Sequence, residues 1–170
     1  SGDAVYVERC QFTNNAADDL GGAIFSYANI VVKNSSFTKN SALKGGAIYS
    51  DSSNVVISTS TFTDNAAKSG EGGAIYSSKW THIENSTFTR NTAAKQGGAI
   101  YFETYTVNSV INTNNFNSNS SNKFGGALYA ASLADNKLVI NNNSFDNNSS
   151  VERGGALFLS NTIAANVHNN

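Results

Sequence analysis

The chain has 170 residues and a formal net charge of −1. It contains no run of acidic or basic residues, so there is no electrostatic reason to expect a nucleic acid or an anionic membrane surface as its partner. No apolar segment approaches the roughly 20 residues that cross a bilayer, and we expect no membrane span. The single cysteine, Cys10, excludes a disulfide within the chain.

Short runs of β-forming residues follow one another in a fixed order. Ala4–Val7 comes first, and it is followed by an F-x-x-N motif, by a Gly-Gly-Ala-Ile run and by the aliphatic pair Val31 and Val32. The last three kinds of run then recur. The Gly-Gly-Ala-Ile or Gly-Gly-Ala-Leu runs lie at residues 21–24, 45–48, 72–75, 97–100, 125–128 and 154–157. The F-x-x-N motifs are Phe12/Asn15, Phe37/Asn40, Phe62/Asn65, Phe88/Asn91, Phe116/Asn119 and Phe145/Asn148.

This repeat predicts a parallel β-helix. The Gly-Gly pairs recur every 24 to 29 residues, and each run between them is too short for a helix and rich in β-branched or aromatic residues. One coil would hold three short strands, and successive coils would stack about 4.8 Å apart. Helical repeats and propeller blades have longer periods. We therefore expect an all-β fold of about six coils that forms a single domain over residues 1–170.

Stacked coils place the same position of every repeat in one column. We expect two apolar columns to fill the interior, the Phe residues of the F-x-x-N motifs and the Ile or Leu residues at positions 24, 48, 75, 100, 128 and 157. The Asn of each motif is predicted to bond to the Asn one layer away at a corner. Each Gly pair predicts a corner with a positive φ. Two residues before each Phe stands a small or polar residue, expected to form an inward ladder: Cys10, Ser35, Ser60, Ser86, Asn114 and Asn143.

The pairing of Gly-Gly-Ala-[Ile/Leu/Val] with F-x-x-N in fixed phase resembles the repeat of the chlamydial-type polymorphic outer membrane proteins. The six runs and six motifs that carry the resemblance span nearly the whole chain. The resemblance implies a right-handed β-helix, a place outside the cell or at the cell surface, and a structural or adhesive role.

The acidic residues do not predict a catalytic pair. Glycoside hydrolysis needs two carboxylates roughly 5–10 Å apart, which in a β-helix would stand at matching positions of neighbouring coils. Asp64 is expected between Lys39 and Arg90 in a solvated charge column, and His82 and His168 lie far apart in the sequence. We predict no catalytic, cofactor-binding or metal-binding residue and no enzymatic activity. A polysaccharide-binding or polysaccharide-cleaving β-helix is the alternative, which aligned acids on adjacent coils would favour.

Two outward-facing series are candidate interaction sites. An aromatic residue follows each inward Ile or Leu, and alternation turns it outward: Phe25, Tyr49, Tyr76, Tyr101, Tyr129 and Phe158. These rings would stack on sugars or on a neighbouring solenoid, or they would pack on one another and under nearby loops, which we favour. Sequons for N-glycosylation occur at Asn34, Asn85, Asn119, Asn142, Asn147 and Asn148. Asn34, Asn85 and Asn142 share one position in the repeat and would line one face.

Both ends of the chain align with the aliphatic strand, at Ala4–Val7 and at Ile163–Val167. The two edges are therefore in phase, which permits copies to stack head to tail into a filament. A fragment of a longer β-helical protein explains the same phase. We expect an extracellular or cell-surface structural protein, adhesin-like or filament-forming. Its partners would be other copies end to end, cell-surface ligands or glycans.

Overall fold

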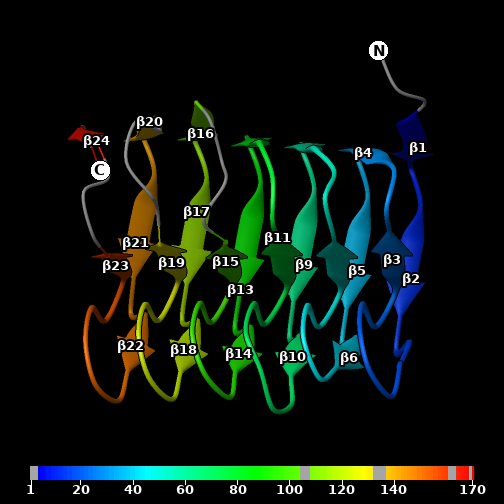
Figure 1. The fold of residues 1–170 in the computed structure, drawn as a ribbon, viewed down its shortest axis with the longest axis horizontal. Helices are drawn as coiled ribbons and strands as arrows, with labels where there is room; N and C mark the ends of the chain where they lie inside the picture. Colours follow the sequence, from blue (N-terminus) through cyan, green and yellow to red (C-terminus); the bar gives the residue numbers. More distant parts are fainter. Residues whose placement is uncertain (1–3, 104–107, 132–136, 161–163, 169) are drawn as a thin grey trace.

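The chain winds into coils that follow one another along one long axis, from the N-terminal coil in blue to the C-terminal coil in red (Figure 1). The computed structural model describes residues 4–103, 108–131, 137–160, 164–168 and 170. Within these residues every named strand pairs in parallel with the equivalent strand of the next coil. The predicted all-β parallel β-helix is confirmed.

Four parallel sheets run along the solenoid. The valine sheet contains the aliphatic pairs and consists of β1 (Ala4–Glu8), β4 (Asn29–Lys33), β8 (Val55–Ser58), β12 (Thr81–Glu84), β16 (Ser109–Asn112), β20 (Lys137–Asn141) and β24 (Ala164–His168). The phenylalanine sheet carries the F-x-x-N motifs and consists of β2 (Gln11–Thr13), β5 (Ser36–Thr38), β9 (Thr61–Thr63), β13 (Thr87–Thr89), β17 (Asn115–Asn117) and β21 (Ser144–Asp146). The isoleucine sheet follows the Gly-Gly pairs and consists of β3 (Ile24–Ser26), β7 (Ile48–Ser50), β11 (Ile75–Ser77), β15 (Ile100–Phe102), β19 (Leu128–Ala131) and β23 (Leu157–Ser160).

The fourth sheet, named the short sheet, differs from the three strands per coil that the sequence predicts. It consists of two-residue strands: β6 (Ser41–Ala42), β10 (Ala66–Ala67), β14 (Thr92–Ala93), β18 (Ser120–Ser121) and β22 (Ser149–Ser150). Each of these strands comes directly after an F-x-x-N motif. Two residues are too few to show the alternation that identifies a strand in a sequence, so only the stacking of the coils reveals it.

Identical residues stack on one another in the core. Phe37 pairs in register with Phe12 and Phe62, and ring centroids along the phenylalanine column are 4.7–4.9 Å apart with interplanar angles of at most 10°. In the isoleucine column Ile48 and Ile75 are fully buried. Both predicted columns are therefore continuous. Because one coil cannot cover its own apolar face, the burial of each layer depends on its neighbours.

Each Gly-Gly pair meets two different backbone requirements. The first glycine of all six pairs, as at Gly72, has a φ of 58–68°, which lies in the left-handed region that glycine adopts without cost. This confirms the predicted corner. The second glycine, as at Gly73, has no room for a side chain, because a Cβ there would overlap the carbonyl oxygens of Gly98 and Thr92. The coils therefore approach each other at backbone contact at this position.

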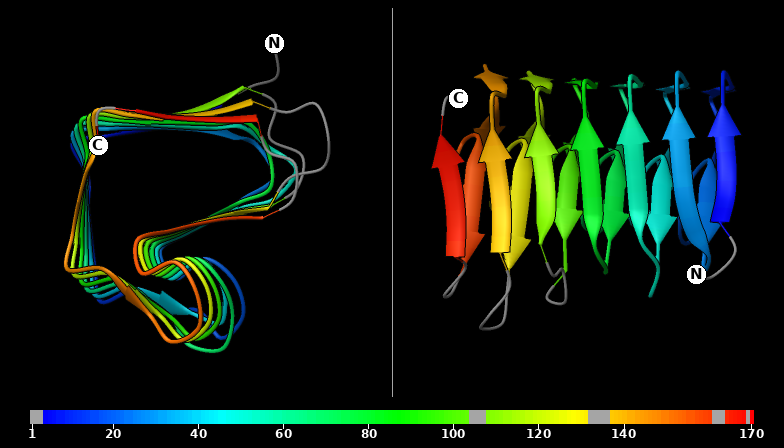
Figure 2. Two further views of the ribbon diagram at one scale, coloured as in Figure 1. Left: turned by 90° about the vertical axis from the view of Figure 1, so that its left-hand side faces the viewer. Right: turned by 90° about the horizontal axis from the view of Figure 1, so that it is seen from above.

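Seen along its axis, the solenoid has a main body and a smaller lobe on one side (Figure 2). The lobe contains the short sheet and the loops that lead from it to the Gly-Gly pairs (Figures 1 and 2). The phenylalanine, isoleucine and valine columns pack into one continuous core cluster. Lys44 and Phe124, which precede Gly-Gly pairs, contact the aromatic residues on the outer face of the isoleucine sheet. The lobe therefore covers part of that face.

Candidate functional site

The predicted aromatic column lies on the outer face of the isoleucine sheet, from Phe25 to Phe158. Neighbouring ring centroids are 4.4–5.7 Å apart. The ammonium group of Lys44 lies 5.6 Å from the centre of the Tyr76 ring, and Tyr76 is only 3 % exposed. Because neighbouring rings face one another, the faces of the inner rings are occupied within the protein. The ring of Phe25, at the N-terminal end of the column, is 40 % exposed.

Two carboxylates line up beside this column. Asp51, Ser78 and Glu103 each stand six residues after the first glycine of a pair, and their backbone nitrogens donate to carbonyl oxygens of the preceding coil. Since coils are about 4.8 Å apart, the backbones of Asp51 and Glu103 are separated by about 9.6 Å. A search for acids on adjacent coils overlooks this pair, because one coil intervenes. The constant offset from the Gly-Gly pairs is the sequence signal that identifies it.

A polar pocket, a cavity of about 270 Å³, opens beside the aligned acids. It is lined by Asp51, Ser52, Ser78, Lys79 and Glu103. The backbone nitrogen of Ser52 donates to Oγ of Ser78 at 2.7 Å, and the same hydroxyl lies 3.4 Å from Oδ1 of Asp51. Two acidic residues, two serines and one lysine from three successive coils thus line one small space.

The phenol groups beside the polar pocket are neutral hydrogen-bond donors. Burial raises the pKa of Tyr76, and the hydrogen bond of 2.5 Å that its hydroxyl donates to Oε2 of Glu103 raises this pKa further. Burial also raises the pKa of Tyr101, and the nearby Glu103 carboxylate adds to the effect. The pKa of Tyr49 is raised by burial as well. The covered column therefore holds one carboxylate of the pocket in place.

An ion-pair cluster ties three coils together beneath the lobe. The buried Glu71 carboxylate lies 3.2 Å from Nζ of Lys44 and 3.4 Å from Nζ of Lys95. The Lys44 contact is an ion pair without hydrogen-bond alignment, since Oε2 of Glu71 accepts no well-directed hydrogen bond. Desolvation of the buried Glu71 carboxylate offsets part of this attraction, and the side chains of Lys44 and Lys95 remain 39 % and 46 % exposed. We assign the cluster a structural role in holding the lobe.

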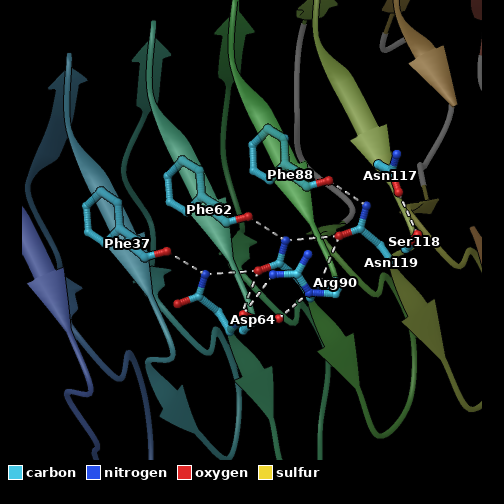
Figure 3. Close-up of polar contacts among 10 residues, drawn as sticks. Phe37, Phe62, Asp64, Phe88, Arg90, Asn117, Ser118 and Asn119 are labelled. Atoms are coloured by element: carbon cyan, nitrogen blue, oxygen red, sulfur yellow. Dashed lines mark hydrogen bonds and ion pairs between the residues drawn. The ribbon is translucent and has the colours of Figure 1, made fainter. Parts of the chain in front are cut away.

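The other ionisable residues singled out in the sequence lie elsewhere. Arg90 donates two hydrogen bonds to Asp64, of 2.7 and 3.0 Å (Figure 3). The hydrogen bond from Arg90 lowers the pKa of the Asp64 carboxyl, with the charge of Lys39 contributing less. The expected charge column is therefore present. His82 is half-buried on the valine sheet, with Nε2 3.4 Å from Oε2 of Glu84.

The asparagines of the F-x-x-N motifs form the predicted ladder. The side-chain nitrogen of Asn65 donates to Oδ1 of Asn91 at 2.9 Å and to the carbonyl oxygen of Phe37 at 3.0 Å. The same pattern repeats at Asn91, which donates to Asn119 and to Phe62 (Figure 3). Both side chains are fully buried. The ladder therefore stabilises the corners of the coils, and the amides of its fully buried rungs are unavailable to a ligand.

The ladder two residues before each Phe is also present. The backbone nitrogen of Ser35 donates to Oγ of Ser60 at 3.1 Å, and that of Asn114 donates to Oδ1 of Asn143 at 2.9 Å. Cys10 occupies the first place, and its backbone nitrogen donates to Oγ of Ser35 at 3.1 Å. Cys10 is half-buried and packs against the core, which matches its interpretation as a small residue in a serine position.

The six candidate glycosylation residues fall into two groups. Four are exposed turn residues with φ of 49–53°: Asn34, Asn85, Asn142 and Asn147. Asparagine tolerates this left-handed region better than most residues, which accounts for these positions without a glycan. Asn119 differs from these four, because its side chain is fully buried and donates to Asn148 and to the Phe88 carbonyl. Asn148 is half-buried in the same ladder.

Comparison with known proteins identifies the family. The family described as "Right handed beta helix region" matches residues 1–101, more than half of the chain. The chain belongs to this right-handed β-helix family. No curated protein and no solved structure matches it. The family match gives the β-helix the right-handed sense that the repeat resemblance implies.

The chemistry available to this β-helix follows from its donor groups. Among the residues that the structure describes, no three His, Cys, Asp or Glu side chains converge as metal ligands would.

In the same part of the chain, no helix has the length and apolar character needed to cross a membrane. The fold itself is compatible with enzymes and with non-enzymes. The groups in the polar pocket suit hydrogen bonds with a polar organic ligand.

Proposed function

We propose that this β-helix is a non-catalytic structural protein of the cell surface or the extracellular space, serving as a stalk, an adhesive surface or a filament wall. The observation that carries the proposal is the asparagine ladder, which runs unbroken from Asn15 to Asn148. Side chains as well as strands bond each coil to its neighbours, so the coils form a stiff rod. Such a rod holds its outer face at a fixed spacing.

Two features support a place outside the cell. The repeat resembles that of the chlamydial-type polymorphic outer membrane proteins, which implies surface display and adhesion. In addition, the sequon residues Asn34, Asn85 and Asn142 are exposed at the same corner of different coils. Glycans at this corner would decorate one edge of the rod. The partners of such a surface are other cell-surface molecules, including glycans.

The filament form of the proposal is head-to-tail association of copies. Every coil offers the same strand edges and ladders to the next, so the edge of one copy is complementary to the opposite edge of another. Light scattering and electron microscopy of the purified chain should then show long particles. A stable monomer at high concentration would contradict the filament form and favour the stalk or adhesive form.

Surface labelling tests the location. Intact cells of the source organism are treated with an amine-reactive biotin reagent that does not cross membranes, and exposed lysines such as Lys33 and Lys68 accept the label. The protein should be labelled in intact cells while a cytosolic control protein is not. Labelling that occurs only after lysis would overturn the surface role. Binding of the fluorescent chain to intact cells then measures adhesion.

A further inference from the structure

We propose that the polar pocket binds one uncharged pyranose ring of a polysaccharide. A stalk or filament does not require such a site, so the inference goes beyond the proposed function. It gives a specific location to the polysaccharide-binding alternative that the sequence raises, and it does not depend on where the protein is displayed.

The size of the polar pocket limits its ligand to a small one, no larger than about one sugar ring. Its volume of about 270 Å³ falls just below the range of roughly 300–1,000 Å³ that is typical of sites for drug-sized ligands. The ring would lie between Asp51 and Glu103, whose backbones stand two coils apart, about 9.6 Å. Ser78 occupies the coil between them at the same position.

The side chains of the polar pocket complement sugar hydroxyl groups. Carboxylates accept hydrogen bonds from neighbouring hydroxyls, and such charge-assisted bonds are stronger than neutral ones. The ammonium group of Lys79 donates to hydroxyl or ring oxygens. Neither Asp51 nor Lys79 has an ion-pair partner within the described part of the chain. Oδ1 of Asp51 accepts hydrogen bonds of 3.3 and 3.4 Å from the hydroxyl groups of Ser52 and Ser78, so its negative charge is solvated by hydroxyls rather than neutralised.

The net charge of the pocket selects against acidic sugars. Two carboxylates and one ammonium group leave one excess negative charge, which repels uronic acids and sulfated sugars. The ring faces of the neighbouring column are also occupied by stacking, at 4.4 Å between Tyr49 and Tyr76. Recognition would therefore rely on hydrogen bonds from hydroxyl groups.

The polar pocket is organised before any ligand binds. The hydroxyl of Tyr76 fixes Glu103 through a bond of 2.5 Å, and Ser78 is held by the backbone nitrogen of Ser52 at 2.7 Å. Because the coils beneath these residues are rigid, less conformational entropy is lost on binding.

Titration of the full 170-residue chain with a panel of oligosaccharides tests the proposal. The panel contains neutral hexose, pentose and N-acetylhexosamine oligomers and matched uronic-acid oligomers, and calorimetry or ligand-observed NMR reports binding. At least one neutral oligomer should bind, and the uronic-acid oligomers should bind more weakly. Asp51→Ala and Glu103→Ala should each weaken binding about tenfold or more.

Two further variants separate the site from general effects. Asp64→Ala removes the same charge at a distant position and should leave affinity unchanged. Ser78→Leu fills the polar pocket without altering its charge and should abolish binding while the circular dichroism spectrum stays native. The proposal is overturned if no neutral oligomer binds, if uronic-acid oligomers bind better, or if a natively folded Ser78→Leu protein binds as the unmodified chain does.

Discussion

Oδ1 of Asn91 accepts a hydrogen bond of 2.9 Å from the side-chain nitrogen of Asn65 in the preceding coil. The side-chain nitrogen of Asn65 also donates to the Phe37 carbonyl. The side-chain oxygen of Asn65 accepts hydrogen bonds from the backbone and side-chain nitrogens of Asn40. One buried amide thus joins three coils. A slip of one residue between coils would leave these groups unpaired in the interior, which is costly. The ladder therefore keeps the register.

Removal of a central rung should be strongly destabilising. Asn65→Ala leaves the backbone nitrogen of Asn40 and the Phe37 carbonyl without their partners, and we expect a loss of roughly 2–4 kcal/mol in the free energy of unfolding. Asn15→Ala is the matched control, because Asn15 is exposed and, among the described residues, its side chain donates to Asn40 alone. Urea denaturation measures both. Equal losses at the two positions would contradict the role of burial.

A methyl group at the second glycine should disrupt the contact between coils. In Gly73→Ala the added Cβ would overlap backbone oxygens of the next coil, which cannot move without separating the strands. We expect a loss of more than about 3 kcal/mol or failure to fold. Gly155→Ala is the control, since its Cβ would meet only the Asn148 oxygen at 3.2 Å. Thermal unfolding followed by circular dichroism compares the two variants, and similar midpoints would refute this account of the glycine.

A turn threonine offers a stabilising substitution. Thr113 is exposed and has a φ of 56°, a conformation that is unfavourable for a β-branched residue and tolerated by asparagine. Thr113→Asn should therefore raise the free energy of unfolding by roughly 1 kcal/mol, and it creates no sequon. The reverse change, Asn85→Thr at the equivalent turn, should lower it by a similar amount. Chemical denaturation checks the pair, and changes of the same sign in both would be inconsistent with turn strain.

Stability should fall at alkaline pH. The pKa of Tyr76 is raised in the folded protein, by burial first and then by Glu103. The neutral Tyr76 phenol therefore stabilises the folded state fully below the unfolded pKa of about 10, and this contribution is lost as the pH rises above that value. Tyr76→Phe should make the fall in the free energy of unfolding between pH 10 and 11 shallower, by up to about 1.4 kcal/mol per pH unit. Tyr27→Phe, at a side chain that is 70 % exposed, should leave the decline unchanged. An identical pH profile for Tyr76→Phe would oppose this prediction.

Burial should decide which sequons accept glycans. When the chain is produced in a eukaryotic host that glycosylates secreted proteins, modification is expected only at exposed sites such as Asn34 and Asn85. Asn119 should remain unmodified in folded protein, because its side chain is fully buried in the ladder. Mass spectrometry of peptides before and after enzymatic deglycosylation measures occupancy. A glycan on Asn119 in protein with native circular dichroism would show that the ladder opens at this rung.

The sequence by itself determined the coil and its columns. A phenylalanine such as Phe62 recurs three residues before an asparagine and 8 to 10 residues before the next Gly-Gly pair. Stacked coils must bring like residues together, because each layer faces the same burial problem. The positive φ at Gly72 also followed from the motif, since glycine alone adopts that conformation freely.

Only the tertiary structure decided what lies around those columns. The two-residue strands, the cover over Tyr76 and the polar pocket at Asp51 and Glu103 depend on loops of unequal length and on contacts between coils. A repeat period specifies which residues stack, but it does not specify how a loop folds back over the outer face. The burial of Asn119 shows the same limit, because a sequon records local residue types and accessibility is a property of the packed coils.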